Sequence, residues 1–454
     1  MKKFVSIFKN KEIVGRIFFT IMILLVLRIG AAITVPGVKA TDELQQALNT
    51  SSAVGLMNLL GGGALSNFSV FALGVSPYIT AQIIIQLLSK DVLPALTELS
   101  KQGEYGRKKQ EMATRYLTLL LGAVQADGII RTMETNSYIS FDADFVSGFW
   151  RYAYIVVIQL GGAMLTMWLG DQITEKGLGN GISVIIFAGC VRSLPIQIST
   201  AWQKWITQNQ AHGPNELIKG SFQFALYLLV FILITAFVVF IELSKRKIPV
   251  QHAGKGQNAA MAKASFLPLK VNSAGVMPII FSSSIMMAPS VIASFISSEA
   301  ANATWLQIFN YSIMYKMPGV DGNTWSMPWG LIIYTVLNIV FSFFYAQMEI
   351  DPEQLADNFQ KNGSYIPGIR PGKETERYVG KVLNRITCIG AIALALVAAL
   401  PIILTLTGIF GNDSSLAIGG TGMIIVVGVA LELNAQIDGL LAGKSFEQVQ
   451  QGGY

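Results

Sequence analysis

The sequence predicts an all-α protein that crosses a membrane many times. Of its 454 residues, 52% are hydrophobic and only 13% are charged, whereas roughly 25% of the residues in a soluble domain are charged. Ten apolar runs approach the length of about 20 residues that a helix needs to span a bilayer. Lysine and arginine gather in alternate connections between these runs. Together these features argue against a disordered chain, a disulfide scaffold and a soluble enzyme.

Each apolar run is interpreted as one membrane-spanning helix. The sixth run is the clearest, because no charged residue interrupts it from Phe222 to Ile241. The third is the weakest, since it contains Asp127 and Arg131, which lie four residues apart on one helical face and can pair. The ten predicted spans cover residues 17–35, 70–88, 113–132, 152–170, 182–200, 222–242, 273–296, 329–348, 386–407 and 417–437.

The first run also resembles a secretory signal peptide, because lysines precede it and Ala31-Ala32 follows its apolar core. It is longer than the apolar segment of a signal peptide usually is, and nine further candidate spans follow it. We therefore interpret it as a first span that is not removed.

The basic residues predict the orientation of the chain. An even number of spans places both termini on one side of the membrane. That side holds 25 of the 33 lysines and arginines. Because connections rich in lysine and arginine stay in the cytoplasm, we expect both termini there.

The spans divide into two halves of five. Residues 1–200 form the N-terminal half and 222–437 the C-terminal half, joined by an external connection at 201–221 and followed by a cytoplasmic tail at 438–454. Because five is an odd number, the halves would have opposite orientations in the membrane, which suits an inverted repeat. No repeat is evident at the level of residues, so ten spans without internal symmetry remain an alternative.

Three segments are neither spans nor ordinary loops. Residues 53–69 are apolar but interrupted by three glycines, which suits either a sheltered re-entrant segment or a helix at the membrane surface. The loops at 244–271 and 349–380 are long and basic, and a turn rich in glycine and proline in the second is expected to expose Arg370. Each loop is either solvated surface or a docking surface for a large acidic or RNA-containing partner.

Groups that could carry chemistry are scarce. Only His212 and His252 are present, in loops on opposite sides, so neither a histidine metal site nor a serine–histidine protease is predicted. We expect no cofactor, no metal and no DNA partner. The alternative function is a secondary transporter of a small solute with an inverted repeat. It would need a charged coupling residue inside the membrane, for which Asp127 is the candidate.

Five stretches of the chain resemble the bacterial SecY family, the central subunits of the protein-translocation channel. They occur in the same order as in the family and in both halves, so the resemblance covers nearly the whole chain. The stretches are GGALSNFSVFALGVSPYI (62–79), QITEKGLGNGISVIIFAG (172–189), FLPLKVNSAGVMPIIF (266–281), YIPGIRPGKETE (365–376) and GGTGMIIVV (419–427).

The resemblance implies an hourglass channel with two inverted five-helix halves, a plug and a lateral gate. Its waist would be a ring of apolar side chains, namely Val75, Ile79, Ile182, Ile186, Ile280 and Ile425. The plug would cover about residues 56–68, with Leu56, Leu60, Gly61, Gly62, Gly63, Leu65 and Phe68. The lateral gate would lie between spans 2 and 7, with Thr80, Gln86 and Asn272 at its polar seam.

The resemblance also implies an activity without catalysis. Such a channel passes unfolded secretory polypeptides across the bacterial cytoplasmic membrane and releases transmembrane segments sideways into lipid. Docking would involve Arg370, Lys245, Arg246 and Lys247. The implied partners are the SecE and SecG membrane subunits, the SecA ATPase, the translating ribosome, preproteins with signal sequences, and membrane lipid.

Overall fold

A helix lies within each of the ten predicted spans, although the helix of the second span (70–88) begins only at Ser76, because residues 70–75 form turns. The computed structural model describes residues 10–41, 43–44, 58, 61–89, 93–141, 148–208, 214–252, 265–296, 304–309, 315–318, 324–406 and 414–451. In chain order the ten helices are α2 (Lys11–Ala32), α5 (Ser76–Leu88), α7 (Gly103–Thr135), α8 (Phe149–Lys176), α9 (Gly181–Trp202), α11 (Pro214–Leu243), α12 (Met277–Ile296), α14 (Trp329–Glu349), α16 (Lys373–Leu406) and α17 (Ser414–Gln451).

Seven helices in the described part of the chain are long and apolar enough to cross a membrane. Of the other three, α5 and the apolar start of α12 are shorter. The third, α7, is long but carries a charged first half and the Asp127–Arg131 pair. The protein is therefore a polytopic, mainly helical membrane protein, as the composition predicts.

The ends of several helices have local causes in the sequence. Pro77 stands in the first turn of α5, where its missing N–H would have no helical acceptor. The Asn180 side chain accepts hydrogen bonds from the backbone N–H groups of Ile182 and Ser183 and so caps α9. Two helices extend beyond their apolar spans into polar sequence: α16 begins at Lys373, and α17 continues through the predicted tail to Gln451.

Short helices and strands form the connections between the spans. The strands were not predicted from the sequence. The short helices are α6 (Pro94–Lys101), α15 (Pro352–Lys361), the 3₁₀ helices η1 (Leu65–Asn67) and η3 (Thr304–Phe309), and the π-helix η2 (Gln203–Thr207). The strands are β1 (Val38–Ala40), β2 (Ile139–Phe141), β3 (Lys245–His252), β4 (Ser265–Lys270), β5 (Tyr315–Pro318), β6 (Thr324–Met327) and β7 (Ser364–Tyr365).

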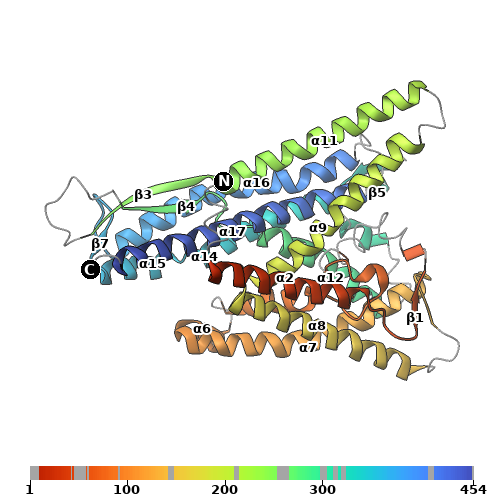
Figure 1. Cartoon of the computed structure of the whole chain (residues 1–454), viewed down its shortest axis with the longest axis horizontal. Helices are drawn as coiled ribbons and strands as arrows, with labels where there is room; N and C mark the ends of the chain where they lie inside the picture. The colour runs from red at the N-terminus through yellow and green to blue at the C-terminus, as the bar shows by residue number, and fades with distance from the viewer. Residues whose placement is uncertain are drawn as a thin grey trace.

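The short elements gather at the two ends of the helix bundle. At one end, β3, β4 and β7 lie beside α15 and the C-terminus, whereas β1 and β5 lie at the opposite end (Figure 1). The pairing of β1 with β2 joins the connection after span 1 to the connection after span 3. The pairing of β3 with β7 likewise joins the connections after spans 6 and 8. Both pairings fit spans that alternate in direction.

Two apolar cores hold the bundle together. The larger includes side chains from both halves, among them Ile186 of α9, Ile280 of α12 and Ile425 of α17. The smaller lies within the N-terminal half, where Leu65 and Phe68 pack against Ile130 of α7 and Ile155 of α8. Helices α9 and α17 contact each other and so connect the halves.

The connection predicted at 201–221 is largely helical rather than an open loop. The π-helix η2 continues α9, and α11 begins at Pro214, with residues 209–213 outside the described part. Aromatic side chains close this hairpin: Trp202 lies 5.3 Å from Phe224 and Trp205 lies 5.5 Å from Tyr227, measured between ring centroids. Such contacts are favourable beyond the area they bury, and they explain the extra helical turns.

The packing of α8 gives a test with an internal control. A Cβ atom at Gly162 would lie 2.0 Å from the backbone oxygen of Val70, whereas one at the neighbouring Gly161 would meet nothing within 4 Å. Gly162→Ala is therefore expected to destabilise the protein by about 1–3 kcal/mol, the usual cost of overpacking. Thermal unfolding in detergent measures the change. Equal transitions for Gly162→Ala and Gly161→Ala would contradict the described packing of α8.

Candidate functional site

A large cavity opens at the end of the bundle that carries α15. Its volume is about 1610 Å³, and its lining residues come mainly from α5, α7, α9, α12 and α15. The lining combines polar and charged side chains with apolar ones, among them Ile79, Ile182, Ile186 and Ile280. The wall of the cavity is therefore mixed in character.

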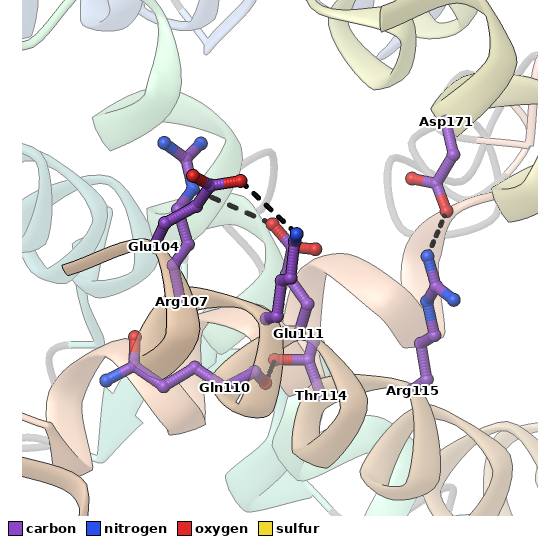
Figure 2. A network of polar contacts seen from close by, with 8 residues as sticks. Glu104, Arg107, Gln110, Glu111, Thr114, Arg115 and Asp171 are labelled. Carbon is purple, nitrogen blue, oxygen red and sulfur yellow. Dashed lines mark hydrogen bonds and ion pairs between the residues drawn. The ribbon is translucent and has the colours of Figure 1, made fainter. Parts of the chain in front are cut away.

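One wall carries paired charges from the first half of α7. The Arg115 Nη2 atom donates to Asp171 Oδ2 at the end of α8 over 2.8 Å, and Arg107 Nε lies 3.6 Å from Glu111 Oε1 (Figure 2). The side-chain amide of Gln110 donates to Leu96 of α6 and to Ser89. These contacts attach α6 to α7 and α7 to α8, and they pair Arg107, Glu111, Arg115 and Asp171, which line the cavity.

A second part of the lining, from α15 and the residues just before it, carries several carboxylates. Asp351 accepts from the backbone N–H of Glu353 over 3.0 Å, which caps α15 and stabilises it at its N-terminus. Glu349, Asp351, Glu353 and Asp357 all line the cavity. This wall thus presents carboxylates to the cavity at an end of the protein whose loops are otherwise basic.

The six residues predicted for the ring converge in space. Val75, Ile79, Ile186, Ile280 and Ile425 are between 1% and 3% exposed and belong to one apolar cluster. Ile182 is partly buried and packs against that cluster. Four different helical segments, α5, α9, α12 and α17, supply these side chains. Residues distant in sequence are thus brought together in one apolar cluster, and four of them also line the cavity.

The described part of the predicted plug is a compact turn rather than a regular helix. Gly62 and Gly63 have positive φ angles of 67° and 80°, and η1 follows directly. Leu65 and Phe68 are fully buried in the smaller core, apart from the ring cluster. Leu56 and Leu60 lie outside the described residues. The end of the predicted plug at Phe68 is therefore packed into the N-terminal half.

The three residues predicted for the gate make separate contacts. The Thr80 hydroxyl donates to the backbone oxygen of Ser76 within α5. The Asn272 amide donates to Glu242 Oε1 of α11 over 2.6 Å and to the Gly275 oxygen over 3.0 Å. Gln86 lines the cavity, and its buried Oε1 atom has no hydrogen-bond partner. Helices α5 and α12 contact each other, but no bond joins these three side chains in the described structure.

The two loops predicted for docking form one unit. Strands β3 and β4 pair from Lys245–Lys270 to Val250–Ser265, and β3 continues into β7 through Gln251–Tyr365 and His252–Ser364. A small apolar core beneath them joins Ile248, Leu269 and Ile366 to Val379 of α16. Lys245, Arg246 and Lys247 are exposed at the start of β3.

Arg370 is also exposed, as its turn predicts. Gly368 and Gly372 flank it with positive φ angles of 82° and 101°. The Thr375 hydroxyl donates to the backbone oxygen of Arg370 over 2.9 Å. The turn therefore holds the backbone while the guanidinium faces solvent.

Comparison with known proteins identifies the family. A family model described as SecY matches residues 69–434. The protein translocase subunit SecY 1 of Lactobacillus kefiranofaciens is 42% identical over 97% of this chain and 97% of its own length. The chain belongs to the SecY family. As a SecY-family member it is a protein-conducting membrane channel of the protein translocase and not an enzyme.

Solved structures show the same fold at low sequence identity. A structure describing how the SecY plug domain stabilises the closed translocation channel aligns with a TM-score of 0.65 at 16% identity, over 93% of this chain and 91% of that one. Sec61 in the canine ribosome–channel complex aligns with a TM-score of 0.61 at 15% identity, with the same coverage. The fold of this SecY chain is therefore that of the known channels.

Sequence reasoning missed several contacts around the SecY site. Glu242 ends an apolar run and gives no sign that it meets Asn272. Arg192 stands alone in an apolar helix, yet its Nη1 atom donates to the Gly63 oxygen over 2.6 Å. A lone charge inside a span was the available signal, because such residues usually have a buried partner.

The joined loops give a direct test. Gln251 and Tyr365 are register partners in an antiparallel pair, a spacing within reach of a disulfide. With Cys190 and Cys388 replaced, Gln251→Cys with Tyr365→Cys is expected to oxidise within one chain, measured as loss of maleimide labelling at both sites. Gln251→Cys with Arg370→Cys is the control. Equal oxidation of the two pairs would contradict the β3–β7 register.

Proposed function

We propose that the cavity and the six-residue ring form the conducting path for unfolded polypeptides, and that the contact of α5 with α12 is where apolar segments leave into lipid. The observation that carries the proposal is a large cavity, lined by polar and apolar side chains, whose lining includes Ile79, Ile182, Ile186 and Ile280, all of them predicted ring residues. The proposed activity needs no catalytic group.

The ring suits a substrate of any sequence. Aliphatic side chains attract without direction, so they can close round an extended chain and still release it. In the absence of a chain, a dry apolar constriction resists the passage of ions. The near-complete burial of five of the six side chains, at 1–3% exposure, is what a closed constriction requires.

The plug would block the path next to this ring, and the gate would open from the path sideways into lipid. We assign the segment at 56–68 as the plug and the α5–α12 contact, with Thr80, Gln86 and Asn272, as the gate. An apolar segment of about 20 residues would partition from the channel into lipid when the gate opens. Because Asn272 is bonded to Glu242, gate opening would also strain or break a contact with α11.

We further propose the location and the partners. The excess of basic residues at the end with β3, β4 and β7 supports a cytoplasmic position for that end, in the cytoplasmic membrane of a bacterium. The exposed Lys245, Arg246, Lys247 and Arg370 would bind the SecA ATPase and the ribosome, by analogy with the ribosome-bound canine channel. SecE and SecG would complete the membrane complex.

The surroundings of Asp127 argue against its role as the coupling residue of a transporter. Asp127 accepts from Arg131 over 2.8 Å, and this pair is partly exposed on α7. A carboxylate held by a neighbouring arginine is poorly suited to bind and release a coupling ion.

A photo-crosslink at Ile280 tests the conducting path. A photoreactive residue at position 280 is expected to form an adduct with a stalled secretory precursor, because Ile280 lies both on the cavity and in the ring cluster. A precursor without a signal sequence is the control and should give no adduct. Translocation through the protein with no adduct at position 280 would show that the path lies elsewhere.

The docking surface is tested by reversing one charge. Arg370→Glu is expected to weaken binding of the ATPase or the ribosome by about tenfold or more, as loss of a central arginine commonly does. Lys361→Glu, on α15 in the same connection, is the matched control. Co-sedimentation with ribosomes and ATP-driven translocation measure the effect. Unchanged binding of both partners would remove Arg370 from the docking surface.

A further inference from the structure

The glycine turn before η1 receives two arginines from different helices. Arg192 of α9 donates from Nη1 to the Gly63 oxygen over 2.6 Å. Arg28 of α2 donates from Nη1 to the Gly62 oxygen over 3.3 Å. These two bonds connect adjacent carbonyl groups of the turn to helices that lie about 35 and 130 residues away in the chain.

The two guanidinium groups have few alternatives. Arginine stays charged, and the partly buried Arg192 needs a partner to offset its lost hydration, whereas Arg28 is exposed. Within the described part of the chain, no carboxylate lies within ion-pair distance of Arg28 or Arg192. The carbonyl oxygens of Gly62 and Gly63 are therefore the acceptors that these side chains have found.

Glycine at position 63 is what permits this approach. A Cβ atom there would lie 2.4 Å from Arg192 Nη1, and the positive φ angle of 80° already disfavours other residues. The turn is also braced from within, since the Gly63 oxygen accepts from the Ser66 hydroxyl over 2.8 Å. Its carbonyl group is thus aimed at a guanidinium by a rigid backbone.

Arg192 also links the turn to the ring. It lies on α9, the helix that carries Ile182 and Ile186, and Ile185 and Gly189 of this helix line a small cavity of about 50 Å³ beside Gly61 and Gly62. A movement of α9 that widens the ring would therefore carry Arg192 away from Gly63.

We propose that Arg192, assisted by Arg28, is a positioning residue that holds the Gly61–Gly63 turn in the closed channel and releases it when α9 moves. The inference rests on the proposed plug function of this segment. Losing one hydrogen bond to a charged group commonly shifts an equilibrium about tenfold, so Arg192→Leu should raise the fraction of displaced plug by about that factor.

Thiol labelling measures plug displacement without any substrate. Ala64 is fully buried, so Ala64→Cys, with Cys190 and Cys388 replaced, reacts with a membrane-impermeant maleimide only when the turn leaves its site. Adding Arg192→Leu is expected to speed this labelling about tenfold and to raise ion leak through idle channels in proteoliposomes. Arg192→Lys, which retains a cationic donor, is expected to restore slow labelling.

Two glycine variants separate the loss of the clamp, the hydrogen bond from Arg192 to Gly63, from general backbone strain. Gly62 and Gly63 both have positive φ angles, so alanine strains the backbone at either position. Only at Gly63 does the new Cβ atom meet Arg192, whereas at Gly62 it meets nothing within 4 Å. In the Ala64→Cys background, Gly63→Ala should therefore speed labelling much more than Gly62→Ala does. If Arg192→Leu does not fold, Gly63→Ala serves as the test variant in its place.

The outcomes are distinct. Labelling and leak that stay at the parent level in both Arg192→Leu and Gly63→Ala would overturn the clamp, even where translocation is normal. Because the labelling assay uses no precursor, a parent protein that translocates nothing would contradict the proposed function and leave the clamp to be judged by labelling alone.

Discussion

A wide cavity that is lined in part by polar groups and a dry apolar contact must coexist within one helical bundle. Water in the cavity can satisfy polar groups, but the hydrocarbon around the protein cannot, so the backbone near the contact has to be helical or sheltered. The structure meets this constraint with side chains from α5, α9, α12 and α17, which close the apolar contact from both halves. The rest of the molecule holds these four helical segments at the distance that keeps the contact dry.

Charged side chains near the proposed path have two kinds of partner, depending on where they lie. Around the large cavity, charges are paired with one another, as Arg115 is with Asp171, and they remain close to water. Beyond the ring, Arg28 and Arg192 use backbone oxygens as acceptors. A carboxylate partner would bind more strongly, whereas a neutral backbone carbonyl gives a weaker interaction that can be broken and remade. This suits a segment that is proposed to move.

Local sequence predicted the features that depend on local physics. Apolar length located the ten helices, glycine and proline located the exposed turn at Arg370, and the four-residue spacing anticipated the Asp127–Arg131 pair. Strand β3 was not foreseen because its start is charged and its partner β7 is two residues long and more than 100 residues away. The contacts of Asn272 with Glu242 and of Arg192 with Gly63 were equally hidden, since each depends on how separate helices pack. The ring could be named only through the resemblance to SecY, because isoleucine in a span looks the same whether it faces lipid or a pore.

The joined loops that are proposed for docking would also have a mechanical consequence for the ring. Strand β4 ends at Lys270, Asn272 follows it, and α12 then carries Ile280 to the apolar contact. Across this short stretch the Asn272–Glu242 bond fixes the chain to α11. Because β3 and β4 are joined to β7 and packed on α16, a force applied by a partner at either loop would act on both. Strand β3 follows α11 directly, since the helix ends at Leu243 and the strand begins at Lys245, so this force would also act on α11. The bond between Asn272 and the partly buried Glu242 would therefore couple the movement of α12, and with it Ile280, to that of α11.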